Sequence, residues 1–352
     1  MTTKNSEQKS ALNVVLGAMT FGHEGKHGVR VHDVKEVERI IDVFLAHGHV
    51  EIDNSRFYGE GTTEEVVGQI DWKAKGLKLS TKLHNFHPAY LDNLPKQQQA
   101  SIKLPEISHK YEDMKKQILI SLKALNTDCL DLWYLHFPDR TVPYEVTMKA
   151  VNDLYKEGYF KRFGISNYTA WEVAEIVGIC KANGYIMPTV YQGIYNAIHR
   201  MAEPELIPCL RKFGISFYVF NPLGGGFFTG RYGTGETKLG VDVGSRFDDS
   251  TWQGKAYRKR YWNDAYFTAL ASIQAVAEKH NLTLTEIALR WVSHHSALKR
   301  EYGDAVIIGA SSVKHIEENM NDLDKGPLPN EVIEAVDAAW EVARPFAAKY
   351  HH

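Results

Sequence analysis

The 352-residue sequence predicts a closed (β/α)8 TIM barrel that forms one domain, with its core over about residues 12–345. Eight strand-like segments alternate with helical segments, and no change in composition divides the chain into halves. The strand segments contain consecutive apolar residues, such as LWYL, FYVF and AVII, which is typical of parallel strands buried on both faces. A doubly wound sheet also alternates strands with helices, but it usually has fewer strands at this length, so the count favours the barrel.

In the first half of the chain, each predicted strand is followed by a predicted helix. Asp33 can cap the first helix, and Gly48 follows its end. The polar segment His84–His109, which contains a QQQ run, is interpreted as an insertion that extends the loop after the third strand. The predicted strands lie within Asn13–Gly22, from Glu51, over Lys78–Lys82 and over Cys129–Phe137, and the helices over Val34–Ala46, Thr62–Gln69, Lys110–Leu125 and Tyr144–Glu157.

The second half repeats the alternation with one long interruption. After the seventh strand, a glycine-rich stretch leads into an extended loop with aromatic and basic residues that runs to about Trp262. The predicted strands are Arg162–Tyr168, Thr189–Asn196, Ile215–Gly226 and Ala305–Ser312, and the helices are Thr169–Ala182, Glu203–Lys212, Asp264–Lys279, Leu284–His295, Val313–Asp322 and Glu331–Val342.

Composition limits the classes of partner and the compartment. A formal net charge of −2 gives no electrostatic reason to expect nucleic acid or an anionic membrane surface. No apolar run approaches the ~20 residues of a membrane span, and the polar N-terminus lacks the apolar core of a secretory signal. The three cysteines match no zinc or redox spacing and indicate reduced thiols. We therefore expect a cytoplasmic protein with no metal site.

Four chemically active side chains stand at or just after the ends of three predicted strands: Asp53, Tyr58, Lys82 and His136. Taken singly, each has an ordinary explanation: a helix cap or surface charge for the acid, packing for the phenol, solvation for the lysine and a core position for the histidine. Their joint placement is less easily explained by chance. In a (β/α)8 barrel, catalytic groups lie at the carboxyl ends of the strands, so we expect these four to meet.

These residue types suit proton transfer to a carbonyl oxygen. A free tyrosine has a pKa of about 10, too high for a good acid at neutral pH. An ammonium about 4 Å away is worth roughly 4 kcal/mol at an effective dielectric near 20, enough to lower that pKa by up to about three units. Lys82 is expected to act on Tyr58 in this way, with Asp53 holding the lysine in place. His136 can donate to, or orient, the substrate oxygen.

The segments that carry these residues, EIDNSRFY, STKL and YLHFPD, resemble motifs of the aldo-keto reductases. The stretches SRFDDSTWQGKAYRKRYW, ALRWVSHHSALKREYGDAVIIGASS and AAWEVA are closer still to one branch, the aflatoxin-aldehyde or succinic-semialdehyde reductases. The resemblance spans Leu16 to about Arg344. It implies an NADP(H)-dependent reductase that converts aldehydes or ketones to alcohols, including aldehydes that carry a carboxylate or a second aldehyde group. Tyr58 would be the proton donor, with Asp53, Lys82 and His136 beside it.

The resemblance also implies a cofactor site without a dinucleotide-binding glycine fingerprint, and no GxGxxG motif follows any predicted strand. GISNY, VYQGIYN and NPLGGGFFTGRY follow in the order of the family's cofactor segments. Ser166, Asn167 and Gln192 would hold the nicotinamide carboxamide, and the ring of Phe220 would stack on the nicotinamide. The remaining implied contacts to NADPH or NADP+ are Met19, Asn221, Pro222, Leu223, Gly225, Gly230, Arg231, Arg246, Gly309, Ser311, Ser312, His315, Glu318 and Asn319.

The expected preference for NADPH over NADH depends on the adenosine end of this site. Many members of the family place Lys and Arg on the 2′-phosphate, at positions that are Gly309 and His315 here. The branch uses serines and a remote arginine, which match Ser311, Ser312 and Arg246. An ordinary alternative for the two serines is that they cap the following helix.

The basic stretch Tyr257–Arg260 is the sequence's clue to the substrate. In the resembled branch, the positions of Tyr257 and Arg260 bind an anionic or polar substrate together with the active-site histidine, and a guanidinium matches a carboxylate by paired hydrogen bonds. A solvated basic helix end is the alternative. The branch ends in a tail that reaches the site, whereas this chain ends in PFAAKYHH and departs from that pattern.

Two other function classes stay open at this point. A cofactor-sensing regulatory subunit, like the channel β-subunits that share the barrel, would bind NADPH and turn over slowly. A metal-dependent barrel hydrolase would need paired ligands at strand ends, and His294–His295 lies within a helical pattern instead. The resembled branch is dimeric, so a homodimer is a further expectation.

Overall fold

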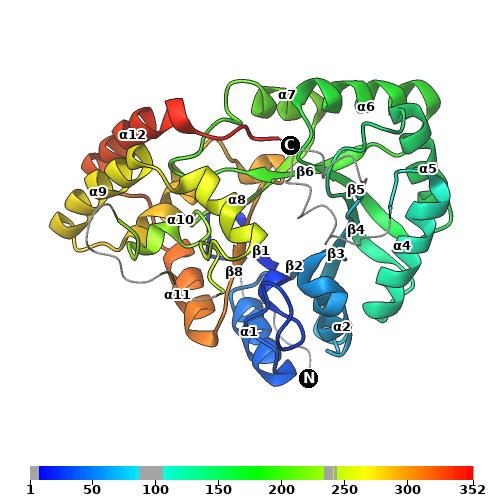
Figure 1. Cartoon of the computed structure of the whole chain (residues 1–352), viewed down its shortest axis with the longest axis horizontal. Helices are drawn as coiled ribbons and strands as arrows, with labels where there is room; N and C mark the ends of the chain where they lie inside the picture. The colour runs from blue at the N-terminus through cyan, green and yellow to red at the C-terminus, as the bar shows by residue number, and fades with distance from the viewer. Residues whose placement is uncertain (1–7, 87–105, 234–240, 242–243, 352) are drawn as a thin grey trace.

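The computed structural model describes residues 8–86, 106–233, 241 and 244–351. Eight parallel strands form a closed barrel in which β1 pairs with both β2 and β8, as predicted (Figure 1). The strands are β1 Asn13–Gly17, β2 Glu51–Asp53, β3 Lys78–Leu83, β4 Leu130–Leu135, β5 Phe160–Ser166, β6 Pro188–Ile194, β7 Ser216–Phe220 and β8 Ala305–Gly309.

Helices surround the barrel, and α9 and α12 lie side by side at one edge of it (Figure 1). Among the described residues, no helix combines the length and the apolar character needed to cross a membrane. The helices are α1 Val34–Ala46, α2 Thr62–Gly68, α4 Tyr111–Ala124, α5 Tyr144–Lys156, α6 Ala170–Asn183, α7 Leu206–Phe213, α8 Trp252–Tyr261, α9 Asp264–Lys279, α10 Leu284–His294, α11 Val313–Leu323 and α12 Asn330–Ala343.

The apolar strand residues are divided between two cores. On β4, Tyr134 belongs to the cluster that fills the barrel, and its neighbour Trp133 belongs to the larger cluster between strands and helices. Both side chains are about 1% exposed, so this strand is buried on both faces. Alternation of side chains along a strand sends neighbours to opposite faces. The inner cluster consists of Val15, Leu132, Tyr134, Val190, Tyr218, Ala305 and Ile307.

One expectation about the second half is wrong, because the long loop after β7 contains the helix α8. The basic stretch Tyr257–Arg260 therefore lies in a helix and not in a loop. The helix begins with Thr251 as its cap, whose hydroxyl accepts from the Gly254 N–H. A Cβ on Gly254 would lie 1.7 Å from the Asp248 carbonyl oxygen, so only glycine lets the first turn pack this closely. The sequence has no apolar stripe here, which is why the helix was missed.

Most of the predicted insertion after β3 falls on residues 87–105, outside the described part of the chain. Its two described ends meet, because Phe86 and Ile107 exchange backbone hydrogen bonds of 2.9 and 2.8 Å. The two described ends of the connection between β3 and α4 are therefore close together.

A buried histidine in the connection between α1 and β2, His49, packs against the amino-terminal end of β1. The Val14 N–H donates to His49 Nδ1 at 3.3 Å, so Nδ1 carries no proton. His49 Nε2 then carries it and lies 3.0 Å from Ser10 Oγ, whose hydroxyl donates to the Leu12 carbonyl. Burial lowers the pKa of His49 to about 4, helped by the charges of Arg300 and His47.

The free energy of unfolding is therefore expected to fall in acid, and His49 should contribute to that fall. An unfolded histidine has a pKa near 6.5, so between about pH 6.5 and pH 4 the unfolded state binds a proton that folded His49 does not. The difference amounts to roughly 2 kcal/mol between pH 7 and pH 5. Urea unfolding of wild type and His49→Gln at both pH values measures this contribution. An equal acid loss in the two proteins would contradict it.

Candidate active site

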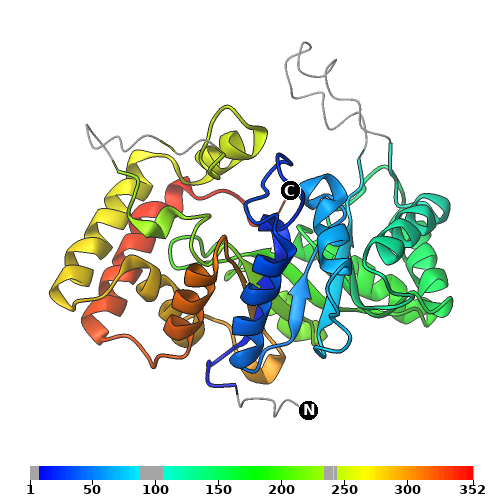
Figure 2. The ribbon, with the colours of Figure 1, turned by 90° about the horizontal axis from the view of Figure 1, so that it is seen from below.

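The carboxyl ends of β2, β3 and β4 bring the four predicted side chains together. Asp53 ends β2, Lys82 lies near the end of β3, and His136 directly follows β4. Tyr58 begins the short 3-10 turn η2 (Tyr58–Gly61) after β2. Because the four groups lie at the carboxyl ends of strands, they lie at the end of the barrel where (β/α)8 enzymes carry their catalytic residues. Figure 2 shows that the helix α8 lies on the side of the barrel away from the N-terminus, as does the loop that follows β1.

Lys82 is the centre of the group. Its side chain is 0% exposed, and its Nζ donates to Asp53 Oδ2 at 2.6 Å and to the Asn54 carbonyl oxygen at 2.7 Å. The third contact is with the Tyr58 hydroxyl oxygen at 3.3 Å. An ammonium has three N–H donors, so each of them has an oxygen acceptor.

Asp53 is held as firmly as Lys82. Its second oxygen, Oδ1, accepts from Gln192 Nε2 at 2.9 Å and from Ser80 Oγ at 3.3 Å. A buried charge is tolerated when it is paired and hydrogen-bonded, and both conditions hold here. β6 therefore helps to fix the ion pair through Gln192.

The electrostatics of Tyr58 differ from the expectation. Burial raises the pKa of Tyr58 well above its usual value, and the charge of Asp53 raises it further. The net shift is therefore opposite to the lowering that was predicted from Lys82, because burial disfavours a phenolate and the negative charge of Asp53 acts in the same direction. Burial also lowers the pKa of Lys82, although Asp53 acts in the other direction. Tyr58 consequently holds its proton at neutral pH.

His136 lies edge-on to Tyr58, with ring centroids 5.9 Å apart. Two side chains that were not predicted contact its Nδ1: Ser55 Oγ at 3.2 Å and His84 Nδ1 at 3.4 Å. The spacing Lys82–His84 was an available signal, because alternate residues of a strand point to the same side. Ser55, two residues after Asp53, had no comparable signal.

The predicted carboxamide residues lie at the ends of β5 and β6. Asn167 has a left-handed backbone (φ 68°), and its Nδ2 donates to Ser166 Oγ at 3.0 Å and to the His136 carbonyl at 2.9 Å. The Nε2 of Gln192 is bound to Asp53, which leaves its Oε1 as the group that can accept from a ligand. These residues lie at the same end of the barrel as the Asp53–Lys82 pair.

The segment after β7 has the features of a site for a polar, anionic ligand. Phe220 ends the strand half-buried, and the buried Nδ2 of Asn221 has no hydrogen-bond partner among the described residues. Gly224–Gly226 follow with φ of 59°, 70° and 103°, values that favour glycine. A Cβ on Gly225 would lie 2.2 Å from the Tyr257 ring, so the ring rests on this glycine turn. An orphaned amide beside a glycine turn fits the phosphates of a dinucleotide.

Two arginines flank Tyr257 above this turn. Arg246 Nη1 donates to the Tyr257 hydroxyl at 2.9 Å, and that hydroxyl donates to Asn221 Oδ1 at 2.9 Å. The Arg260 guanidinium lies 5.7 Å from the centroid of the Tyr257 ring. Burial would raise the pKa of Tyr257, but the two guanidinium charges and the hydrogen bond from Arg246 outweigh it and leave the pKa below its usual value. Tyr257 thus connects Arg246 and Arg260 to the loop that follows β7.

The predicted adenosine end lies at β8 and α11. Ser312 caps α11 and accepts from the His315 N–H, and Ser311 Oγ lies 2.9 Å from His315 Nδ1. The helix-cap reading of Ser312 is therefore confirmed, and one residue can serve both roles. Asn319 donates to the Gly309 carbonyl at 3.4 Å. Arg246 Nη2 would lie 3.9 Å from a Cβ on Gly309, so this cation reaches the end of β8.

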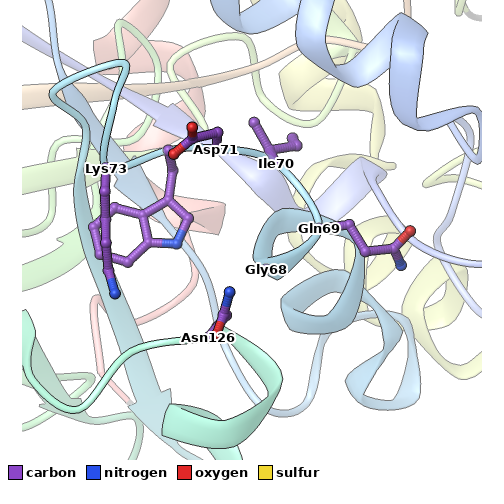
Figure 3. Close-up of a pocket in the computed structure, with 7 residues that line it drawn as sticks. Gly68, Gln69, Ile70, Asp71, Lys73 and Asn126 are labelled. Atoms are coloured by element: carbon purple, nitrogen blue, oxygen red, sulfur yellow. The ribbon is translucent and has the colours of Figure 1, made fainter.

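A surface pocket at the other end of the barrel is separate from these groups. It is lined by Gly68–Lys73 and Asn126, which lie at the end of α2 and in the connections that precede β3 and β4 (Figure 3). Within the ranges that the structure describes, no three His, Cys, Asp or Glu side chains form a metal-binding group.

Comparison with known proteins identifies the family of the chain. Residues 13–341 match the aldo/keto reductase family model. An aldo-keto reductase of Pseudocercospora fijiensis is 47% identical over 311 residues, covering 88% of this chain and 99% of that protein. The human aldo-keto reductase family 7 member A3 is 40% identical and human aflatoxin B1 aldehyde reductase member 4 is 38% identical, each covering 93% of both chains. The chain therefore belongs to the aldo/keto reductase family of nicotinamide-dependent oxidoreductases, as its motifs predicted.

Proposed function

We propose that this protein reduces aldehydes to alcohols with NADPH, using Tyr58 as the proton donor. The observation that carries the proposal is the chain of contacts from Asp53 through Lys82 to the Tyr58 hydroxyl, with His136 beside it. The names of the human relatives, which include aflatoxin B1 aldehyde reductases, support an aldehyde as the class of substrate.

In this proposal the substrate's carbonyl oxygen accepts hydrogen bonds from the Tyr58 hydroxyl and from His136. A reduced nicotinamide, when bound, would supply the hydride that the carbonyl carbon accepts. As the oxygen becomes an alkoxide, which is a stronger base than a phenolate, the Tyr58 proton moves to it. Lys82, 3.3 Å away, stabilises the phenolate that remains. The raised pKa of Tyr58 is compatible with this role, because the donor must be protonated when the substrate binds.

The chain's own residues suit the cofactor. Ser166, Asn167 and the Gln192 Oε1 would bind the carboxamide, and Phe220 would cover one face of the ring. Pro222, Leu223, Gly230 and Arg231 continue the predicted phosphate-binding segment beyond Asn221 and Gly225. Arg246, Ser311, Ser312 and His315 would receive the 2′-phosphate, and we therefore propose NADPH over NADH. Met19 and Glu318 complete the proposed set.

Arg260 is proposed to select substrates that carry a carboxylate. Arg260→Ala should raise KM about tenfold or more for such aldehydes, because a charge-assisted hydrogen bond is lost, and should change KM for neutral aldehydes little. Arg258→Ala is the matched control, since Arg258 lies on the same helix but donates to the Phe247 carbonyl and contacts Asp249. Equal effects of Arg260→Ala on both substrate types would remove Arg260 from substrate selection.

Steady-state consumption of NADPH across a panel of charged and neutral aldehydes, run in parallel with NADH, tests the whole proposal. We expect turnover with NADPH and a much lower kcat/KM with NADH. Tight NADPH binding without turnover on any aldehyde would instead favour the regulatory-subunit alternative.

A further inference from the structure

Ser55 and His84 are the two side chains whose contacts with His136 the catalytic scheme does not use. Ser55 is fully buried, and its Oγ lies 3.2 Å from His136 Nδ1. His84 Nδ1 lies 3.4 Å from the same nitrogen. A histidine in its neutral form carries one proton, so these two neighbours bear on which ring nitrogen holds it.

The buried hydroxyl of Ser55 needs an acceptor for its proton. Its oxygen already accepts from the Phe57 N–H at 3.3 Å. Among the described residues, His136 Nδ1 is the acceptor that the structure provides for the Ser55 hydroxyl proton. Burial makes an unused hydroxyl donor energetically costly. The Ser55 hydroxyl is therefore satisfied when His136 Nδ1 carries no proton.

The ring of His84 is held in one orientation by its neighbours, and its contact also favours a His136 Nδ1 without a proton. Its ring stacks on Phe57, with centroids 4.0 Å apart and planes 15° from parallel, and meets Phe137 edge-on at 5.3 Å. Burial lowers the pKa of His84 to about 4, so the ring is neutral at neutral pH. Two N–H groups or two lone pairs facing each other at 3.4 Å would repel, so one Nδ1 must carry a proton and the other must not. With Ser55 donating to His136, the repulsion is avoided when His84 Nδ1 carries the proton, and the two donors then share the single lone pair of His136 Nδ1.

We propose that Ser55 and His84 are positioning residues that fix His136 in its Nε2–H form, so that this ring presents an N–H donor to the substrate oxygen. The tautomer itself follows from the contacts described above, whereas its use in orienting a carbonyl rests on the proposed function. Neither residue touches the reacting atoms in this scheme. Both act through His136, as a hydrogen bond to one imidazole nitrogen commonly sets the state of the other.

The tautomer can be measured directly on the full chain labelled with [15N]histidine. A long-range 1H–15N spectrum at neutral pH distinguishes a protonated ring nitrogen from a bare one, and His136→Gln and His84→Phe identify the two residues by loss of their signals. We expect His136 with a bare Nδ1 and a protonated Nε2, and His84 with a protonated Nδ1. A protonated Nδ1 on His136 in the wild-type protein would overturn the proposal.

Variants then test the two positioning residues separately. Ser55→Ala should shift the His136 signals toward the other tautomer and lower kcat about five- to tenfold, the effect of one lost hydrogen bond, whereas Ser55→Thr keeps a hydroxyl and should restore both readouts. His84→Phe keeps an aromatic ring on Phe57, removes the donor and should move the same signals. The Kd for NADPH should stay unchanged in all three variants.

Unchanged His136 signals in both Ser55→Ala and His84→Phe would overturn the proposal even if kcat fell, because a merely structural role lowers the rate without moving the tautomer. The outcome is independent of the proposed activity. A His136 in the Nε2–H form, in a protein that reduces no aldehyde, would support the tautomer assignment and remove the proposed function.

Discussion

Tyr58→Phe is expected to lower kcat by roughly 10²–10⁴-fold, the usual contribution of a positioned general acid. The substitution removes the hydroxyl that Lys82 contacts and leaves the ring, the Asp53–Lys82 pair and the His136 contact in place. Binding of NADPH, measured by quenching of protein fluorescence, should therefore persist.

Tyr266→Phe provides the matched control for this experiment. Tyr266 is a fully buried residue of α9 whose hydroxyl has no hydrogen-bond partner among the described residues, so its removal should leave kcat close to that of wild type. Turnover that survives in Tyr58→Phe would mean that another group supplies the proton.

Lys82→Met is expected to reduce the free energy of unfolding by roughly 3–5 kcal/mol at pH 7, in addition to abolishing activity. The reason is that Asp53, 3% exposed, would keep a buried charge with Gln192 and Ser80 on Oδ1 but without a cation beside Oδ2. Removing one partner of a buried ion pair costs more than replacing both.

Urea unfolding of Lys82→Met, Asp53→Asn and the double variant measures this coupling. The double variant should recover much of the stability that Lys82→Met loses, because its amide needs hydrogen bonds but no counter-charge. A double variant as unstable as the sum of the two single variants would show that the two residues act independently, contrary to their 2.6 Å contact.

Much of the barrel could be predicted because several of its strands are short and continuously apolar, as in LWYL and AVII, and some of the helices that follow begin with a capping side chain, as α6 and α11 do. The helix α8 could not be predicted in this way. It has no apolar stripe and contains Gly254, whose place against the Asp248 carbonyl is a tertiary feature. Most of the insertion proposed for His84–His109 lies outside the described residues.

The catalytic group could be predicted because barrel geometry brings the carboxyl ends of the strands together. The positions of Asp53, Lys82 and His136 at or next to three strand ends were therefore enough to predict that they meet. The environment of Tyr58 could not be read from spacing. Its raised pKa depends on burial and on the nearby charge of Asp53, which are properties of the packed structure. The contact of Ser55 with His136 joins the ends of two strands and had no sequence signal, whereas His84, two residues after Lys82, carried one that the prediction did not use.

The most direct test of the central claim is the fate of the cofactor's hydrogen in a single reaction. Wild-type protein would be incubated with an aldehyde and NADPH that carries deuterium at both C4 positions of the nicotinamide, and the product examined by mass spectrometry and NMR. The account predicts one alcohol formed per NADPH consumed, with deuterium on the carbinol carbon. An alcohol without deuterium, or NADPH bound with no alcohol formed from any aldehyde tested, would contradict it.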